Sequence, residues 1–166
     1  QPRYNVQLKD DKSYPYIAVT REPFPRVYKT RNIERAGKGS RVSYANYFGP
    51  YTSVQSVKAL LDIVRKVYKI RSCRYNLNDE DIKAGKFKVC LEYHIKRCKG
   101  PCEGLQSSEE YKKNVEEVVE ILKGNISIIE KEVREKMEAL SEQLRFEEAN
   151  ELKEKLFLIG SLDRKS

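Results

Sequence analysis

The sequence lacks any long apolar run, because no stretch of 18 or more apolar residues occurs in its 166 residues. A membrane-spanning helix needs a run of about that length, so we expect no contact with a membrane. The first 15 residues, QPRYNVQLKDDKSYP, contain no apolar signal core, which argues against secretion by that route. These two absences predict a cytoplasmic protein.

An initiator methionine is also missing, since the chain begins at Gln1. We therefore expect a fragment of a longer protein or a processed product. Apolar residues make up only 39% of the chain and charged residues 35%. This balance favours small units joined by solvated helices over one large compact core.

Positive charge is concentrated in the front part of the chain. Residues 1–106 contain 22 Lys and Arg against 10 Asp and Glu, whereas residues 107–166 contain 11 against 15. A basic half of this kind is typical of a protein that binds a polyanion, most often nucleic acid. A solvated basic surface without a partner is the alternative interpretation.

Hydrophobic patterns and turn signals predict an α+β fold. Strands are expected at 14–20 and 26–31, separated by a turn at EPFP. Ser53 is a candidate N-cap for a helix that runs to about Lys69. Ser107 and Glu110 have capping-box spacing before a second helix that ends at Gly124.

The pattern of residues 126–160 predicts an antiparallel helical hairpin. Apolar residues recur every three or four positions from Ile126 to Leu144, and the pattern resumes at Phe146 after a break near Arg145. Each half has one apolar stripe and one charged face, so the two halves can bury their stripes against each other. The whole fold is then a small β-rich or irregular, cysteine-rich part with one helix, followed by a long helix and this hairpin.

Four cysteines are the candidate metal ligands: Cys73, Cys90, Cys98 and Cys102. Their spacings of sixteen, seven and three residues match no double-knuckle zinc ribbon, in which both ligand pairs are close in sequence. Four thiolates also satisfy the ligand requirement of an iron–sulfur cluster, which accepts uneven spacing. The pattern favours a metal site over free thiols and iron–sulfur over zinc, with zinc as the open alternative.

Residues around the last two cysteines are suited to such a site. Lys96, Arg97 and Lys99 are expected to lower the pKa values of the thiols and to offset thiolate charge. Gly100 and Pro101 prevent a continuing helix and let the backbone wrap closely around a centre.

The single histidine, His94, lies four residues from both Cys90 and Cys98. On one helical face these three residues could form a Cys–His–Cys ligand set. A lone histidine is more often a hydrogen-bonded structural residue, and we interpret His94 in that way.

Three segments resemble the UvrC family, the nucleases of the bacterial ABC excinuclease in nucleotide excision repair. PRYNVQLKDDKSYPYI is similar to the block at the end of the family's N-terminal GIY-YIG nuclease domain. YFGPYTS and CLEYHIKRCKGPC are similar to its cysteine-rich region. LRFEEANELKEKL resembles the UVR motif, a hairpin that also occurs in UvrB and in regulators of clp proteases.

The resemblance implies five parts along the chain. They are a remnant of the GIY-YIG domain (1–34), the cysteine-rich region (35–106), a connecting helix (107–125), the UVR hairpin (126–160) and a tail (161–166). It also implies a [4Fe–4S] cluster on Cys73, Cys90, Cys98 and Cys102. It implies no complete nuclease site, because both nuclease domains and their divalent metals would lie outside this chain. Whether the chain is an enzyme by itself therefore stays open.

The resemblance also implies two partners, damaged duplex DNA and UvrB. Basic residues would neutralise DNA phosphates without reading sequence, namely Lys9, Lys12, Arg21, Arg26, Arg31, Arg35, Lys38 and Arg41. UvrB would dock at the hairpin turn, on Leu144, Phe146, Glu147, Glu148 and Ala149, with Phe146 as the anchor. The alternative is a zinc-binding adaptor whose UVR hairpin regulates a clp protease.

Overall fold

The computed structural model describes residues 14–31 and 44–165, in a chain that divides into two compact units. The first unit covers residues 1–115 and the second residues 116–166, so the division falls within helix α5 (Ser108–Leu122). A three-stranded antiparallel sheet belongs to the first unit, and the second is helical. The predicted α+β class is confirmed.

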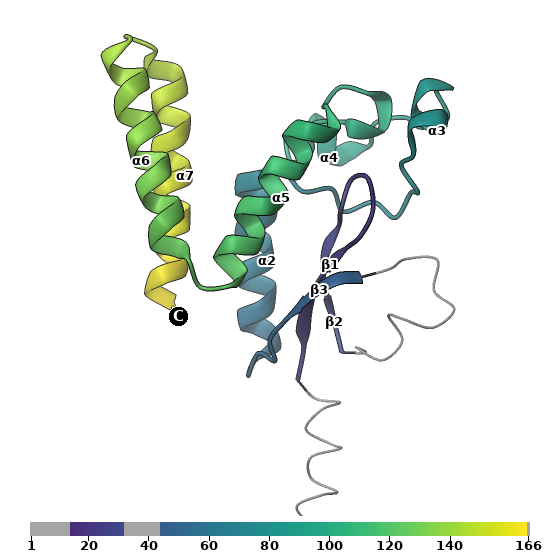
Figure 1. Ribbon diagram of the computed structural model, residues 1–166, viewed down its shortest axis with the longest axis horizontal. Helices are drawn as coiled ribbons and strands as arrows, with labels where there is room; N and C mark the ends of the chain where they lie inside the picture. The colour runs from purple at the N-terminus through teal and green to yellow at the C-terminus, as the bar shows by residue number, and fades with distance from the viewer. Residues whose placement is uncertain (1–13, 32–43, 166) are drawn as a thin grey trace, which may run out of the picture. The chain divides into compact units, whose positions relative to one another are not determined.

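The sheet has the strand order β2-β1-β3, with β1 in the centre (Figure 1). Ile17 of the central strand lies opposite Lys29 on one side and Phe48 on the other. The two strands predicted near 14–20 and 26–31 are confirmed, and the third was not predicted. Its pairing with β1 means that the boundary expected between residues 34 and 35 falls inside one sheet. The strands are β1 (Tyr16–Thr20), β2 (Val27–Thr30) and β3 (Tyr44–Phe48).

The turn between β1 and β2 is closed by its own polar side chains. The hydroxyl of Thr20 accepts a hydrogen bond from the backbone N–H of Arg26 at 2.7 Å. The Nε of Arg26 in turn pairs with Glu22 Oε2 at 3.0 Å. These contacts fix the turn and leave the second carboxylate oxygen of Glu22 facing the rest of the unit.

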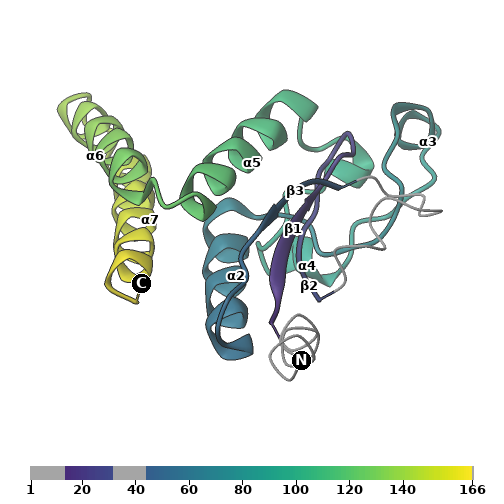
Figure 2. The ribbon, with the colours of Figure 1, turned by 60° about the horizontal axis from the view of Figure 1, so that its bottom comes forward.

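Helix α2 (Val54–Tyr68) follows the sheet and lies beside it (Figure 2). The predicted N-cap is confirmed, because the Ser53 side chain accepts from the N–H of Ser56 at 3.2 Å. Lys69 ends the helix in the left-handed conformation. One apolar face is buried, made of Val57, Leu61, Val64 and Tyr68.

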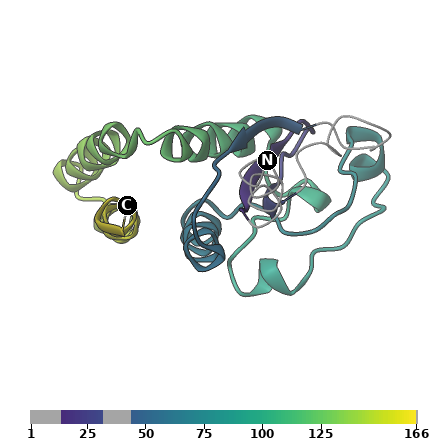
Figure 3. The same ribbon diagram turned by 90° about the horizontal axis from the view of Figure 1, so that it is seen from below.

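The cysteine-rich segment between α2 and α5 is mostly irregular (Figure 3). Its helices are short: α3 (Asp79–Lys83), α4 (Leu91–His94) and the 3₁₀ turn η2 (Pro101–Glu103). Asn78 caps α3 by accepting from the N–H of Asp81 at 2.9 Å. Only a few of the segment's apolar side chains are buried, among them Leu77 and Phe87. Little apolar burial is therefore available to hold this segment in place.

Helices α6 (Ile126–Glu142) and α7 (Phe146–Lys165) form the predicted antiparallel hairpin (Figure 1). Leu144 in the turn has a positive φ of 61°. Helix α7 continues to Lys165 and so includes most of the residues expected as a tail, 161–166. The apolar pattern continues past Ile159, because Leu162, three residues later, is also buried.

The connection into the hairpin also follows the sequence prediction. The Ser107 side chain accepts from the N–H of Glu110 at 3.1 Å, which is the first half of a capping box. Gly124 after α5 has a φ of 94°, as a residue just beyond a helix end requires. In the described ranges, no helix has both the length and the apolar character needed to cross a bilayer.

Candidate metal centre

All four cysteines line a single small cavity within the first unit. Cys73 lies after α2, Cys90 is the residue before α4, Cys98 follows α4, and Cys102 lies in η2. None of them forms a disulfide. The irregular segment thus brings together side chains that are up to 29 positions apart in the sequence.

Arg71 positions the first cysteine. Its side chain is buried, and its Nη1 donates to the Cys73 carbonyl at 3.0 Å and to the Cys73 Sγ at 3.3 Å. The same nitrogen donates to the Tyr75 carbonyl at 2.9 Å. One guanidinium nitrogen therefore contacts the carbonyl and the sulfur of Cys73 and the carbonyl of the residue two positions later.

The other nitrogens of Arg71 tie this segment to the β1–β2 turn. Nε donates to the Phe24 carbonyl at 2.9 Å, and Nη2 lies 3.4 Å from Glu22 Oε1. The backbone N–H of Arg71 donates to the hydroxyl of Tyr111 at 3.2 Å, and that hydroxyl donates to the Pro25 carbonyl at 2.7 Å. A buried guanidinium with its donors satisfied is a rigid support, whereas an unpaired one would be very costly. The role of Arg71 was not predicted from the sequence. The only feature of the sequence that indicates it is the position of Arg71 two residues before Cys73.

The other three cysteines are placed by local backbone turns. Cys90 precedes α4, and its carbonyl accepts from the N–H of Tyr93 at 3.0 Å. The sulfur of Cys98 lies 3.5 Å from the N–H of Gly100, which donates to it. Gly100 has a φ of 72°, and a Cβ there would lie 3.1 Å from side chains of Leu105, Tyr93 and Val89. Only glycine fits this turn without strain.

Burial raises the pKa of the Cys98 thiol, and the nearby Cys73 and Cys90 raise it further. Burial likewise raises the pKa of the Cys102 thiol, with Cys73 and Cys98 adding to the effect. The mutual effect arises because thiolates in one low-dielectric cavity repel each other. Four thiolates could share this cavity only with a positive centre between them.

The expected role of the neighbouring cations is wrong. Lys96, Arg97 and Lys99 are exposed, and the pKa values of Cys98 and Cys102 are raised rather than lowered. The cation that acts on the Cys98 thiolate is Arg71, because it is the one buried beside the cavity.

His94 does not share a helical face with the cysteines. Helix α4 ends at His94, so Cys98 lies beyond the helix. The imidazole is exposed and lies edge-on to the Tyr93 ring, with centroids 5.6 Å apart. The ligand set with His94 is therefore not formed, and the residue lies outside the cavity lining.

The donor set of the cavity fits a soft metal centre, since it presents four sulfurs and two N–H donors aimed at sulfur. Hydrogen bonds to ligand sulfurs are a usual feature of iron–sulfur sites. Within residues 14–31 and 44–165, no three His, Cys, Asp or Glu side chains are gathered closely enough to hold a single ion.

The predicted DNA-binding residues are only partly described. Arg21 and Arg31 are exposed, at the end of β1 and after β2. Arg26 is half-buried, pairs with Glu22 and lies over the Tyr28 ring at 5.4 Å. The others lie outside the described residues: Lys9, Lys12, Arg35, Lys38 and Arg41.

The predicted partner-binding residues lie at the α6–α7 turn. Leu144 and Phe146 are large apolar side chains that are 73% and 62% exposed. Glu147 is exposed, and Glu148 forms an ion pair with Arg145 at 2.5 Å. Ala149 differs from the expectation because it is buried within the hairpin and offers a partner little surface.

Comparison with known families covers both units. Residues 14–121 match the family model described as "UvrC/Cho excinuclease, middle domain", and residues 129–162 match the model described as "UvrB/uvrC motif". The cysteine-rich segment lies within the first match. No solved structure matches the chain.

Several curated proteins named "UvrABC system protein C" are similar to the chain. The protein from Bacteroides thetaiotaomicron is 51% identical over all 166 residues, which are 26% of its own length. Those from Porphyromonas gingivalis ATCC 33277 and Chlorobaculum tepidum are 47% and 46% identical, over 99% and 92% of the chain and 26% and 23% of their own lengths. The chain thus spans about a quarter of these relatives. It belongs to the UvrC/Cho excinuclease family and contains the family's middle domain followed by the UvrB/UvrC motif.

Proposed function

We propose that this chain is the central scaffold of UvrC, the nuclease of the UvrABC excinuclease in nucleotide excision repair, and that its four cysteines hold a [4Fe–4S] cluster. The observation that carries the proposal is that Cys73, Cys90, Cys98 and Cys102 all line one cavity. Within the whole excinuclease, which incises on both sides of a lesion, the chain holds the nucleic acid and UvrB.

The electrostatics of the cavity support a bound cationic centre. The raised pKa values of Cys98 and Cys102 reflect burial and thiolate repulsion, and iron would relieve both. Sulfurs that line a cavity, rather than meet at a point, suit a cluster whose ligands bind separate iron atoms. Zinc, the alternative, requires all four sulfurs about 2.3 Å from one ion.

The cluster has a structural role in this proposal. Its binding energy would hold together the segment from Cys73 to Cys102, which buries few apolar side chains. The segment also adjoins Arg71, which links it to the β1–β2 turn. A cluster would therefore stabilise the first unit as a whole.

Anaerobic purification followed by absorption spectroscopy tests the cluster. The chain should be brown, with the broad visible absorbance of iron–sulfur proteins, and Cys98→Ser should lose most of that absorbance. His94→Ala is the matched control, because His94 lies in the same segment outside the cavity and should keep the colour. A colourless chain that contains one zinc ion per molecule would refute the iron–sulfur cluster and favour a zinc site instead.

The proposal includes two partners. The excess of Lys and Arg in residues 1–106 would bind duplex DNA through its phosphates. The exposed Leu144 and Phe146 at the hairpin turn would bind UvrB, since the matched motif is shared by UvrB and UvrC.

DNA binding is tested by titrating a labelled duplex with the chain at several salt concentrations. The association constant should fall steeply as salt rises, because each neutralised phosphate releases counterions. An association constant that does not change with salt would mean that the basic residues of 1–106 form only a solvated surface.

A further inference from the structure

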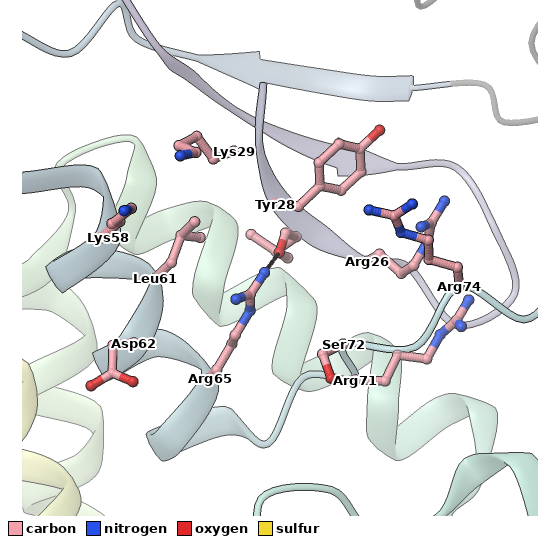
Figure 4. A pocket seen from close by; sticks show the side chains of 11 residues that line it. Arg26, Tyr28, Lys29, Lys58, Leu61, Asp62, Arg65, Arg71, Ser72 and Arg74 are labelled. Carbon is pink, nitrogen blue, oxygen red and sulfur yellow. Dashed lines mark hydrogen bonds between the residues drawn. The ribbon is translucent and has the colours of Figure 1, made fainter. Parts of the chain in front are cut away.

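A second hollow in the first unit lies between β2 and α2 and has a volume of about 740 Å³ (Figure 4). Its lining differs sharply in charge from the cysteine cavity. One carboxylate, that of Asp62, lines it, and that carboxylate pairs with Arg97 at 3.6 Å. Six cationic side chains line it, namely Arg26, Lys29, Lys58, Arg65, Arg71 and Arg74.

Four of these cations form no ion pair with the protein. Arg26 and Arg71 share the carboxylate of Glu22. Lys29, Lys58, Arg65 and Arg74 have no ion-pair partner in the part of the chain that the structure describes. Uncompensated like charges around one hollow repel each other, so an anion in the hollow would stabilise the folded unit.

Arg65 supplies an independent observation at the middle of the hollow. Its Nη2 donates to the Val27 carbonyl at 3.0 Å, which ties α2 to β2. Its Nε is buried and has no hydrogen-bond partner. A buried donor without an acceptor is costly, and an acceptor oxygen supplied by a ligand would satisfy it.

The cations are spread out along the hollow and do not converge on one point. Lys29 and Lys58 lie toward one end, Arg26 and Arg74 toward the other, and Arg65 lies between them (Figure 4). Arg74 also lines a neighbouring hollow, together with Arg21, Lys86, Lys88 and the exposed ring of Tyr75. The carboxylates of Glu22 and Asp81 line this second hollow as well, so it is less basic than the first.

We propose that the hollow between β2 and α2 is a phosphate-binding site for the backbone of a nucleic-acid strand, in which Lys29, Lys58, Arg65 and Arg74 contact phosphates. Charges spaced along a surface suit successive phosphates of a polymer, whereas a single small phosphate needs donors that converge. The site reads no sequence, because it offers charges and no matched set of donors and acceptors for base edges. This proposal rests on the proposed binding of DNA and names the surface on which the DNA would bind.

The salt dependence of binding to the labelled duplex tests the site. The double variant Lys29→Ala/Lys58→Ala should reduce the slope of log K against log salt by about 2, since each lysine accounts for about one phosphate. At low salt its affinity should fall on the order of tenfold or more. The control Lys66→Ala/Lys83→Ala removes the same charge from two exposed lysines outside the hollow, one of them on α2, and should leave the slope nearly unchanged.

Each other outcome overturns a specific statement. Equal slopes for both double variants would refute the site while leaving DNA binding in place through other basic residues. No salt-dependent binding by the unmodified chain would refute both the site and the proposed DNA binding. Displacement of the duplex by millimolar inorganic phosphate at constant ionic strength would show a small-anion site instead of a backbone site.

Discussion

The guanidinium of Arg71 contacts the sulfur of Cys73 at 3.3 Å while its other end reaches the β1–β2 turn at Phe24 and Glu22. One buried side chain therefore connects the sheet to the candidate metal centre. Because the carbonyls of Cys73 and Tyr75 depend on the same guanidinium, the position of that cysteine is set by the packed part of the unit.

Replacing Arg71 with lysine should destabilise the first unit. Lysine keeps the charge but cannot replace a planar group that donates in several directions, so buried carbonyls would lose their partners. We expect the free energy of unfolding to fall by about 2–4 kcal/mol, measured by urea denaturation. The exposed Arg74→Lys is the control, and an equal loss in both variants would contradict the role given to Arg71.

Alanine at Gly100 should be more harmful than alanine at Gly85. Both glycines have nearly the same φ, 72° and 71°, so both variants carry a left-handed alanine that costs about 1–2 kcal/mol. A Cβ at Gly100 also crowds three side chains, whereas nothing lies within 4 Å of one at Gly85. Gly100→Ala should therefore have the lower urea midpoint and the lower iron content. Equal midpoints would show that the turn before Cys102 tolerates a side chain.

Removing the proposed iron–sulfur cluster should loosen the cysteine-rich segment selectively. With a chelator and an oxidant, trypsin should cut residues 73–104 faster, because few buried apolar side chains would still hold that segment. The α6–α7 hairpin should keep its protection, since its two helices pack against each other. Mass spectrometry of the fragments measures both rates, and unchanged cleavage of the segment would argue against a structural centre.

Alanine at Phe146 should weaken the binding of UvrB with little effect on stability. The side chain is 62% exposed, so its loss should change the unfolding free energy by less than about 0.5 kcal/mol. An aromatic anchor is worth about 2 kcal/mol or more, which is roughly a thirtyfold rise in Kd by calorimetry. Ile128→Ala changes an exposed apolar residue at the other end of the hairpin and serves as the control. Equal Kd values for the two variants would show that the hairpin turn is not part of the proposed interface with UvrB.

Local signals in the sequence were enough to predict the four long helices, though not the short helices α3 and α4. Ser53 and Ser107 cap α2 and α5 as their spacing indicated, and the break near Arg145 became the hairpin turn. Helix caps and tight turns depend on residues that are only a few positions apart in the sequence. The third strand depends on pairing with β1 across more than 20 residues, and its sequence YANYF has no clear alternation.

The sequence was enough to group the four cysteines that line the cavity, but not to identify the side chains that hold them in place. Cysteine is rare enough that four in one region indicate a metal site. Arg71 is one of 33 basic residues, and only the tertiary structure distinguishes it by burial and by its contact with Cys73. Lys96, Arg97 and Lys99 lie closer to cysteines in sequence, yet their side chains are exposed to solvent.

Native mass spectrometry of the anaerobically purified chain can detect the proposed cluster directly. We predict one dominant species whose excess mass equals four iron and four sulfide atoms, and the loss of that excess in Cys73→Ser, which changes the proposed ligand most distant in sequence. A dominant species with the mass of the bare chain, or an excess equal to one zinc ion, would contradict it.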